Sequence, residues 1–322
     1  MKNPFANCRA ENLKTMIDRA FSAASKAVEK EDFEGKTTEK AMQKEGLRVK
    51  TCGSTFHDDI TNALNSFPDV YKISAVYSRL SDALIGNENL TRSMRTLNKT
   101  AKEIKKLQLY YLRTLETARH TYQFRTLRKE FYGRSVALLK KHKRHVELLY
   151  EAARILKKLP DFEDVPTVII AGLPNVGKTS LLKALTGSEP EIAPYPFTTK
   201  GLMLGFTEIN GKRIQVIDTP GLLDRPMKKR NPIEKQAIIA LEQLASLAIF
   251  VYDPTETCGY TLEQQKNLFN DVRKQIKVPM IVVANKADLV GEREVESDIK
   301  ISCTDNTGLD NLKTFISEKL KL

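Results

Sequence analysis

The stretch Gly172-Leu-Pro-Asn-Val-Gly177-Lys178-Thr179 decides the fold of this chain. It follows an apolar run at residues 165–171 that is typical of a buried strand, and it precedes residues 180–185, whose apolar spacing is helical. A glycine-bounded turn between a strand and a helix directs backbone N–H groups into one concavity, where they and the helix N-terminus bind phosphate oxygens. The stretch therefore predicts a phosphate-binding loop, with a chance occurrence of the pattern as the alternative.

Two side chains of this loop have separate expected roles. Lys178 would reach the β- and γ-phosphates of a nucleotide, and the Thr179 hydroxyl would bind Mg²⁺. The nucleotide-binding residues predicted in this stretch are Pro174, Asn175, Val176, Gly177, Lys178, Thr179 and Ser180.

A second motif, Asp218-Thr-Pro-Gly221, ends an apolar run at residues 213–217 that reads as a strand. An aspartate in this place can hold Mg²⁺ through water, and the Gly221 N–H can bond to the γ-phosphate. The dipeptide Asn210-Gly211 separates this run from residues 202–209 and predicts a tight hairpin between two strands.

A third motif, Asn285-Lys-Ala-Asp288, follows the apolar run 278–284 directly. The Asp288 carboxylate can accept both N–H donors on one edge of guanine; adenine lacks that pair, so the motif predicts discrimination against adenine. A last strand near residues 300–302 brings a backbone N–H close to the guanine carbonyl. The predicted base-recognition residues are Asn285, Lys286, Asp288, Ser302 and Cys303.

These motifs alternate with helical patterns, which indicates an α/β P-loop GTPase domain with a mostly parallel sheet and helices on both faces. Residues 1–160 instead read as helix almost throughout, with expected helices at 11–30, 39–64, 70–84, 90–124 and 125–158. Pro68 is a candidate start for the third, and Tyr132-Gly133-Arg134 a candidate connection between the long segments. We therefore predict an all-α bundle at 1–160 and a GTPase domain at 161–322.

Composition describes a globular protein of about two domains, because 41% of the 322 residues are hydrophobic and 29% are charged. No apolar run reaches the roughly 18 residues of a membrane span, and the start lacks a signal-peptide core, so we expect no membrane contact. The four cysteines are spread too widely for a zinc site and too sparsely for a disulfide scaffold.

The net charge of +12 lies almost entirely in the first half, where residues 1–165 carry +11. Between residues 101 and 150 there are 13 basic and 4 acidic side chains. Aromatic residues are interleaved with them, namely Tyr110, Tyr111, Tyr122, Phe124 and Tyr132. This pattern predicts a surface that binds RNA phosphates and stacks on bases, whereas the alternative is a solvated helix face with tyrosines in the core.

At this point the sequence resembles a known family. The three motifs mark a translation-factor-class GTPase, and Tyr195-Pro-Phe-Thr-Thr199 is similar to the first switch of the Obg-type group. Asn231-Pro-Ile-Glu-Lys-Gln-Ala237 and Asp253-Pro-Thr-Glu-Thr-Cys-Gly-Tyr260 resemble the Nog branch, the nucleolar-type GTPases of large-subunit assembly. The helical half resembles that branch as well. Nucleolar members carry a long C-terminal extension, so the resemblance implies a short, archaeal-like form in the cytoplasm.

The resemblance implies further roles. Thr199 would be the Mg²⁺ ligand of the first switch, with Thr198 as the weaker candidate, and Lys178, Thr199 and Gly221 would be the catalytic residues. Leu222 stands where Ras-type enzymes carry a water-orienting glutamine, so slow intrinsic hydrolysis is expected. Asn175 resembles the asparagine that binds an activating K⁺ in related GTPases; alternatively, it only shapes the loop.

The predicted function is a GTP-hydrolysing factor that acts on large-subunit rRNA or a pre-ribosomal particle, with ribosomal proteins as further candidate partners and the chain as a monomer. Mg²⁺ and GTP or GDP are the expected cofactors. Two rivals stay open: a GTPase that regulates a protein partner in stress or growth signalling, and an RNA-binding scaffold whose GTPase is nearly idle.

Overall fold

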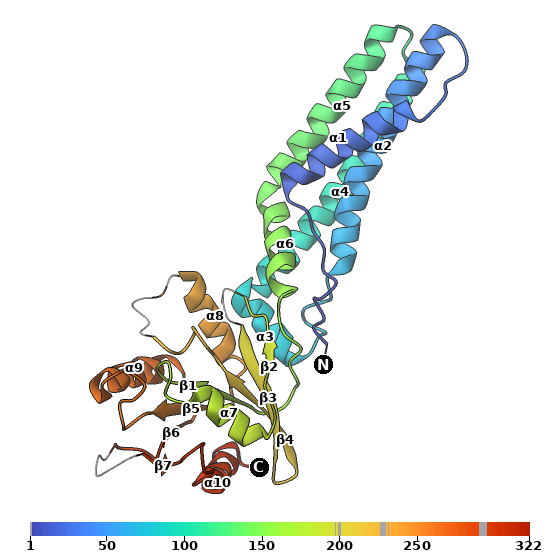
Figure 1. Cartoon of the computed structure of the whole chain (residues 1–322). Helices are drawn as coiled ribbons and strands as arrows, with labels where there is room; N and C mark the ends of the chain where they lie inside the picture. The colour runs from blue at the N-terminus through green and yellow to red at the C-terminus, as the bar shows by residue number, and fades with distance from the viewer. Residues whose placement is uncertain (1, 197, 199–200, 226–229, 231, 290–294) are drawn as a thin grey trace. The chain divides into compact units, whose positions relative to one another are not determined.

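The computed structural model describes residues 2–196, 198, 201–225, 230, 232–289 and 295–322. It divides into two compact units (Figure 1). One comprises Met1–Asn3, Ile73–Leu84 and Lys158–Leu322, and the other comprises Pro4–Lys72 and Ile85–Lys157.

The first unit is built on a seven-stranded sheet in the order β2-β3-β4-β1-β5-β6-β7. The strands are β1 (Thr167–Ala171), β2 (Glu191–Ala193), β3 (Leu202–Ile209), β4 (Lys212–Asp218), β5 (Leu247–Tyr252), β6 (Met280–Ala284) and β7 (Ile299–Lys300). β1 pairs in parallel with β4 and β5, and β5-β6-β7 continue in parallel. Within the described part of the sheet, antiparallel pairing is confined to the β2-β3-β4 edge. The predicted mostly parallel sheet is confirmed.

Every residue of β1 and β5 is buried, which a sheet requires when both of its faces are covered. The covering helices are α7 (Lys178–Thr186), α8 (Pro232–Glu242), α9 (Leu262–Gln275) and α10 (Leu309–Leu320). The predicted hairpin is also present: Asn210 and Gly211 have φ angles of 52° and 72° and connect β3 to β4, as the primed turns of tight hairpins require.

The second unit is all helical (Figure 1). Its helices are α1 (Leu13–Glu29), α2 (Thr37–Ser66), α4 (Asn87–Thr117), α5 (Thr121–Lys141) and α6 (Lys143–Leu156). Fully buried Phe56, Leu97, Ile104 and Phe131 form part of its core. No helix among the described residues is both long enough and apolar enough to cross a bilayer.

Several helix boundaries differ from the predicted ones. The long segments separate at residues 118–120 and at His142, whereas Tyr132-Gly133-Arg134 lies inside α5. A Cβ at Gly133 would meet nothing within 4 Å, so this exposed glycine costs the helix only its weak propensity, about 1 kcal/mol. Pro68 does not open a helix, because the next one, α3 (Ala75–Leu84), begins seven residues later.

Helix α3 belongs to the unit that holds the sheet. The buried Tyr77 hydroxyl donates to the Pro160 carbonyl at 2.8 Å and accepts from the Phe162 N–H at 2.9 Å. Gln236 on α8 donates to the carbonyls of Ala83 and Leu84 at 3.1 and 2.7 Å, and these lie in the last turn of α3. A domain division at residue 160 stays a prediction, but the sheet-bearing unit extends beyond 161–322.

Candidate nucleotide-binding site

The loop between β1 and α7 depends on two glycines. Gly172 has φ 144°, and a Cβ there would lie 2.7 Å from the Val251 carbonyl. Gly177 has φ 102° and precedes the first residue of α7; a Cβ there would run into the Asn285 side-chain nitrogen. Asn175, exposed at the loop tip, also has a positive φ, which asparagine tolerates better than most residues. The loop thus has the tight backbone course that a phosphate cradle requires.

Lys178 lies within this loop with 7% of its surface exposed. Its Nζ donates to the carbonyls of Gly172 and Leu173 at 3.0 and 2.9 Å. These two bonds hold the ammonium at the loop. A fixed positive charge beside backbone N–H groups is what a polyphosphate needs.

Thr179 and Asp218 meet beneath the loop, although they are 39 residues apart in the sequence. The Thr179 Oγ1 donates to Asp218 Oδ2 at 2.7 Å, while Asp218 Oδ1 is buried and has no hydrogen-bond partner among the described residues. Burial raises the pKa of the Asp218 carboxyl, and the Thr179 hydrogen bond and the Lys178 charge oppose that rise. An unpartnered carboxylate oxygen beside a hydroxyl is a donor set that suits a hard cation such as Mg²⁺.

The Asp-x-x-Gly segment turns back on itself after Asp218. The Gly221 N–H, the predicted γ-phosphate donor, here donates to Asp224 Oδ2 at 2.8 Å. Leu222 is 1% exposed and points no polar atom at the site. Thr199, the predicted Mg²⁺ ligand, lies outside the described residues; Thr198 uses its hydroxyl to donate to the Tyr195 carbonyl at 2.9 Å.

The predicted base-recognition motif is hydrogen-bonded to the predicted phosphate loop. The Asn285 side-chain nitrogen donates to the Val176 carbonyl at 3.0 Å, and its Oδ1 lies 3.4 Å from Cys303 Sγ. Asp288 is exposed, and its charge acts on the nearby Cys303. Ser302 is fully buried, and its N–H donates to the Thr307 carbonyl, so this backbone group shapes its own loop.

Asp253 is a residue that the motif analysis missed. It follows β5, is fully buried, and accepts hydrogen bonds from Lys286 Nζ at 2.6 Å and from the Cys258 N–H at 2.7 Å. Burial raises the pKa of the Asp253 carboxyl, but the bonds from Lys286, Thr255 and Cys258 outweigh it and lower the pKa to about 2. Asp253 thus holds Lys286 in place. The signal was the Asp-Pro-Thr-x-Thr sequence directly after a strand.

Replacing Asp253 with asparagine should leave Lys286 without its counter-charge. The Lys286 side chain is 21% exposed, so we expect a loss of about 2 kcal/mol in the free energy of unfolding at pH 7, below the range for fully buried pairs. A depressed carboxyl pKa stabilises the fold above the unfolded pKa of 3.8, and this is lost as the pH falls toward 2. Urea unfolding at pH 7 and pH 3 tests this. Equal stability of Asp253→Asn and an Asp310→Asn control at pH 7 would contradict it.

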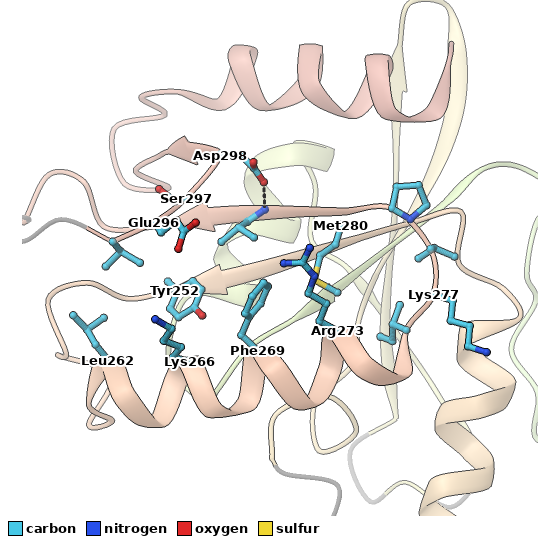
Figure 2. Close-up of a pocket in the computed structure, with 15 residues that line it drawn as sticks. Tyr252, Leu262, Lys266, Phe269, Arg273, Lys277, Met280, Glu296, Ser297 and Asp298 are labelled. Atoms are coloured by element: carbon cyan, nitrogen blue, oxygen red, sulfur yellow. Dashed lines mark hydrogen bonds between the residues drawn. The ribbon is translucent and has the colours of Figure 1, made fainter.

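A groove of about 830 Å³ lies between α9 and β6 (Figure 2). Tyr252, Phe269 and Arg273 point into it, and Glu296 and Asp298 lie on its opposite side. Asp298 accepts a hydrogen bond from the Val282 N–H at 2.7 Å and so extends the edge of the sheet. None of the predicted site residues lines this groove, which therefore is separate from the phosphate loop.

Only some of the basic and aromatic side chains between residues 101 and 150 are exposed as an RNA-binding surface would require. Tyr110 and Tyr122 are 57% and 68% exposed, whereas Tyr111 and Phe124 are core residues at 1% exposure. Arg128 pairs with the buried Glu45 and is not available as a free cation. A shallow groove of about 620 Å³ remains on α4 and α5, where exposed Lys106, Arg134 and Lys141 surround Tyr110.

Two sequence models of protein families match the chain. Residues 10–163 match the NOG1 N-terminal helical domain, and residues 167–286 match a family described as 50S ribosome-binding GTPase. An uncharacterized protein of Methanocaldococcus jannaschii is 42% identical over 80% of this chain and 72% of its own length. Nucleolar GTP-binding protein 1 of Drosophila melanogaster is 30% identical over 85% of this chain.

The chain spans less than half of the fly protein, because the match covers 45% of that relative. Among solved structures, the G domain of the T. maritima FeoB iron transporter is 29% identical over 48% of this chain and 98% of that chain. Its TM-score of 0.40 carries no weight in the assignment. The M. jannaschii relative and the two family models, which match the helical and the nucleotide-binding halves in turn, show that the chain belongs to the NOG1 family of GTPases.

Proposed function

We propose that this chain binds and slowly hydrolyses GTP with Mg²⁺, and that the nucleotide controls a contact between its basic helices and large-subunit rRNA. The observation that carries the nucleotide part is the Thr179–Asp218 pair, with a buried carboxylate oxygen that lacks a partner beneath a glycine-dependent loop. The bond from Asn285 to the Val176 carbonyl supports a single site for base and phosphates.

Each residue has a defined task in this mechanism. Thr179, Asp218 and Thr199 would hold Mg²⁺, which supplies charge neutralisation at the phosphates when bound. Lys178 stabilises negative charge at the loop, and the Gly221 N–H donates to the γ-phosphate. Asp288 accepts the donors of guanine, while Asp253 keeps Lys286 oriented. We propose that Ser302 and Cys303 close the base pocket.

The rate of hydrolysis follows from Leu222, which is 1% exposed and cannot orient a water molecule. Asn175 would bind K⁺ beside the phosphates and partly replace the missing group. We expect single-turnover GTP hydrolysis to be at least about tenfold faster in KCl than in NaCl, as removal of a single charge-stabilising group is worth that much or more. Asn175→Ala should abolish the difference. Equal rates in both salts would remove K⁺ from the mechanism, and absent hydrolysis would favour the scaffold reading.

Two lines of support favour large-subunit rRNA as the partner: the positive charge of the helical unit and the description of the matched family. Residues 101–150 carry 13 basic and 4 acidic side chains, and the exposed Tyr110 lies among Lys106, Arg134 and Lys141. Cations bind RNA phosphates, and an exposed ring stacks on an unpaired base. The matched family description names 50S ribosome binding, which supports the large subunit as the target.

Control by the nucleotide is supported by contacts of α8, the helix that follows the Asp-x-x-Gly segment. The Tyr195 hydroxyl, at the start of the first switch, donates to the Ala237 carbonyl of α8 at 3.2 Å. The adjacent Gln236 binds the last carbonyls of α3, which are otherwise unpaired in a helix. Two residues after α3, the chain enters α4, the helix that carries Lys106 and Tyr110.

Binding of the whole chain to large-subunit rRNA should fall steeply with salt. Changing Lys106, Arg134 and Lys141 to alanine should reduce the slope of log K against log salt by about two, since each phosphate contact contributes about 0.7 on single strands. Filter binding between 50 and 300 mM KCl, a range of about sixfold, measures this. The control changes Lys313, Lys319 and Lys321 on and just after α10. A flat salt response, or equal slopes for both triple variants, would contradict the proposed RNA surface.

A further inference from the structure

The turn from Gly221 to Arg225 is held closed by Asp224 and Arg230, which none of the three nucleotide motifs includes. Asp224 accepts the Gly221 N–H at 2.8 Å. On the other side of the turn, Arg230 donates from Nη1 to the Gly221 carbonyl at 3.2 Å and from Nη2 to the Arg225 carbonyl at 2.7 Å. Arg225 in turn pairs with Glu234 at 2.7 Å. A carboxylate thus holds the Gly221 N–H, and a buried guanidinium holds the carbonyl on the other side of the same residue.

That N–H is the same donor that the γ-phosphate of GTP requires. A backbone N–H has one proton, so a strong bond to a carboxylate and a strong bond to a phosphate oxygen exclude one another. The two acceptors are also both negative, so they repel at close range. GDP has no γ-phosphate and does not compete for Gly221.

We propose that Asp224 is a specificity-determining residue that imitates the γ-phosphate and thereby lowers the affinity of the site for GTP relative to GDP. The inference rests on the proposed function, because it assumes that the site takes a guanine nucleotide. The bond from the Gly221 N–H to Asp224 occupies the donor of the third phosphate, whereas the base and the first two phosphates have other predicted partners. Arg230 holds the next peptide group through the Gly221 carbonyl, whichever acceptor the Gly221 N–H meets.

The same competition would couple GTP hydrolysis to the conformation of the turn from Gly221 to Arg225. GTP has to displace the Asp224 carboxylate to gain the Gly221 hydrogen bond, and this displacement opens the turn that leads into α8. When the cleaved phosphate departs, the carboxylate takes the N–H back and closes the turn. The GDP-bound protein should therefore have the same closed turn as this structure.

The test compares GDP with a non-hydrolysable GTP analogue by titration calorimetry in the presence of Mg²⁺. In Asp224→Ala the analogue should bind about tenfold more tightly, as expected for the loss of a charge-assisted hydrogen bond that has to be broken. GDP affinity should not change. Asp224→Asn keeps a neutral acceptor, so it should give an intermediate gain.

Glu234→Gln is the matched control, because it removes the same charge from the same part of the chain without touching Gly221. Equal gains in Glu234→Gln and Asp224→Ala would reduce the effect to general charge and overturn the inference. An unchanged ratio of the affinities of Asp224→Ala for the GTP analogue and for GDP would also overturn the inference. A parallel loss of both affinities would leave that ratio unchanged and would indicate a damaged fold. If the wild-type chain bound neither nucleotide, the proposed function would fail as well; tight binding with an unchanged ratio would sink this inference alone.

Discussion

Lys178→Ala should reduce the affinity for GTP and GDP by at least about a hundredfold, which corresponds to roughly 3 kcal/mol. Lys178 is 7% exposed and its ammonium is held by the carbonyls of Gly172 and Leu173, so its charge would meet a polyphosphate where water screens little. Hydrogen bonds between charged groups in such a place are the strong ones. Fluorescent-nucleotide titration measures the effect for both nucleotides.

Lys183→Ala provides the control on the same helix. Lys183 pairs with Glu189 at 2.7 Å on the exposed side of α7, so its loss removes a lysine without touching the loop. We expect wild-type affinity from this variant and an unchanged melting temperature. Unchanged nucleotide affinity in Lys178→Ala would refute the phosphate-loop assignment, and circular dichroism would separate that result from unfolding.

The second large effect is expected at Asp288, the exposed residue that we propose accepts the N–H donors of guanine. Asp288→Asn should lower GTP affinity by about three orders of magnitude, because an unpaired donor on the base edge is rejected strongly. An asparagine offers an N–H where xanthine presents a carbonyl. The variant should therefore regain tight binding with xanthosine triphosphate.

The exchange of preference is a sharper readout than the loss alone. A damaged loop would lose all nucleotides, whereas a base-reading residue would lose guanine and gain xanthine. Asp310→Asn on α10, whose side chain is fully exposed, is expected to change neither affinity. If Asp288→Asn still bound GTP as tightly as the wild type, or if the wild type bound ATP equally well, guanine recognition by this motif would be wrong.

The sheet could be predicted because its strands are apolar runs that end in polar motifs. Residues 165–171 and 278–284 contain β1 and β6, and Asn210-Gly211 forms the expected turn. The edge strand β2 was missed, since three residues are too few to display a period. The helix ends near 118–120 and 142 were missed as well, because neither place has a glycine or proline that would indicate a break.

In the candidate site, too, some features could be predicted from the sequence and others could not. Thr179 and Asp218 each lie in a motif, and motif order suffices to predict that they belong to one site. The contacts of Asp224 with Gly221, and of Asp253 with Lys286, arise from the paths of short loops. No periodicity describes such paths, and tertiary packing decides them. The same holds for α3, whose sequence is helical but gives no sign of the unit it joins.

The placement of α3 has a practical consequence for the design of truncated fragments. The sheet-bearing unit is discontinuous: the chain supplies one helix to it, leaves for more than seventy residues, and returns at Lys158. A fragment that starts at residue 161 would strip away Tyr77 and expose the face of α8 where Gln236 reaches for Ala83 and Leu84. Isolated halves would thus be poor surrogates for the intact protein, and nucleotide binding and the proposed RNA contact are best separated by point changes in the uncut chain.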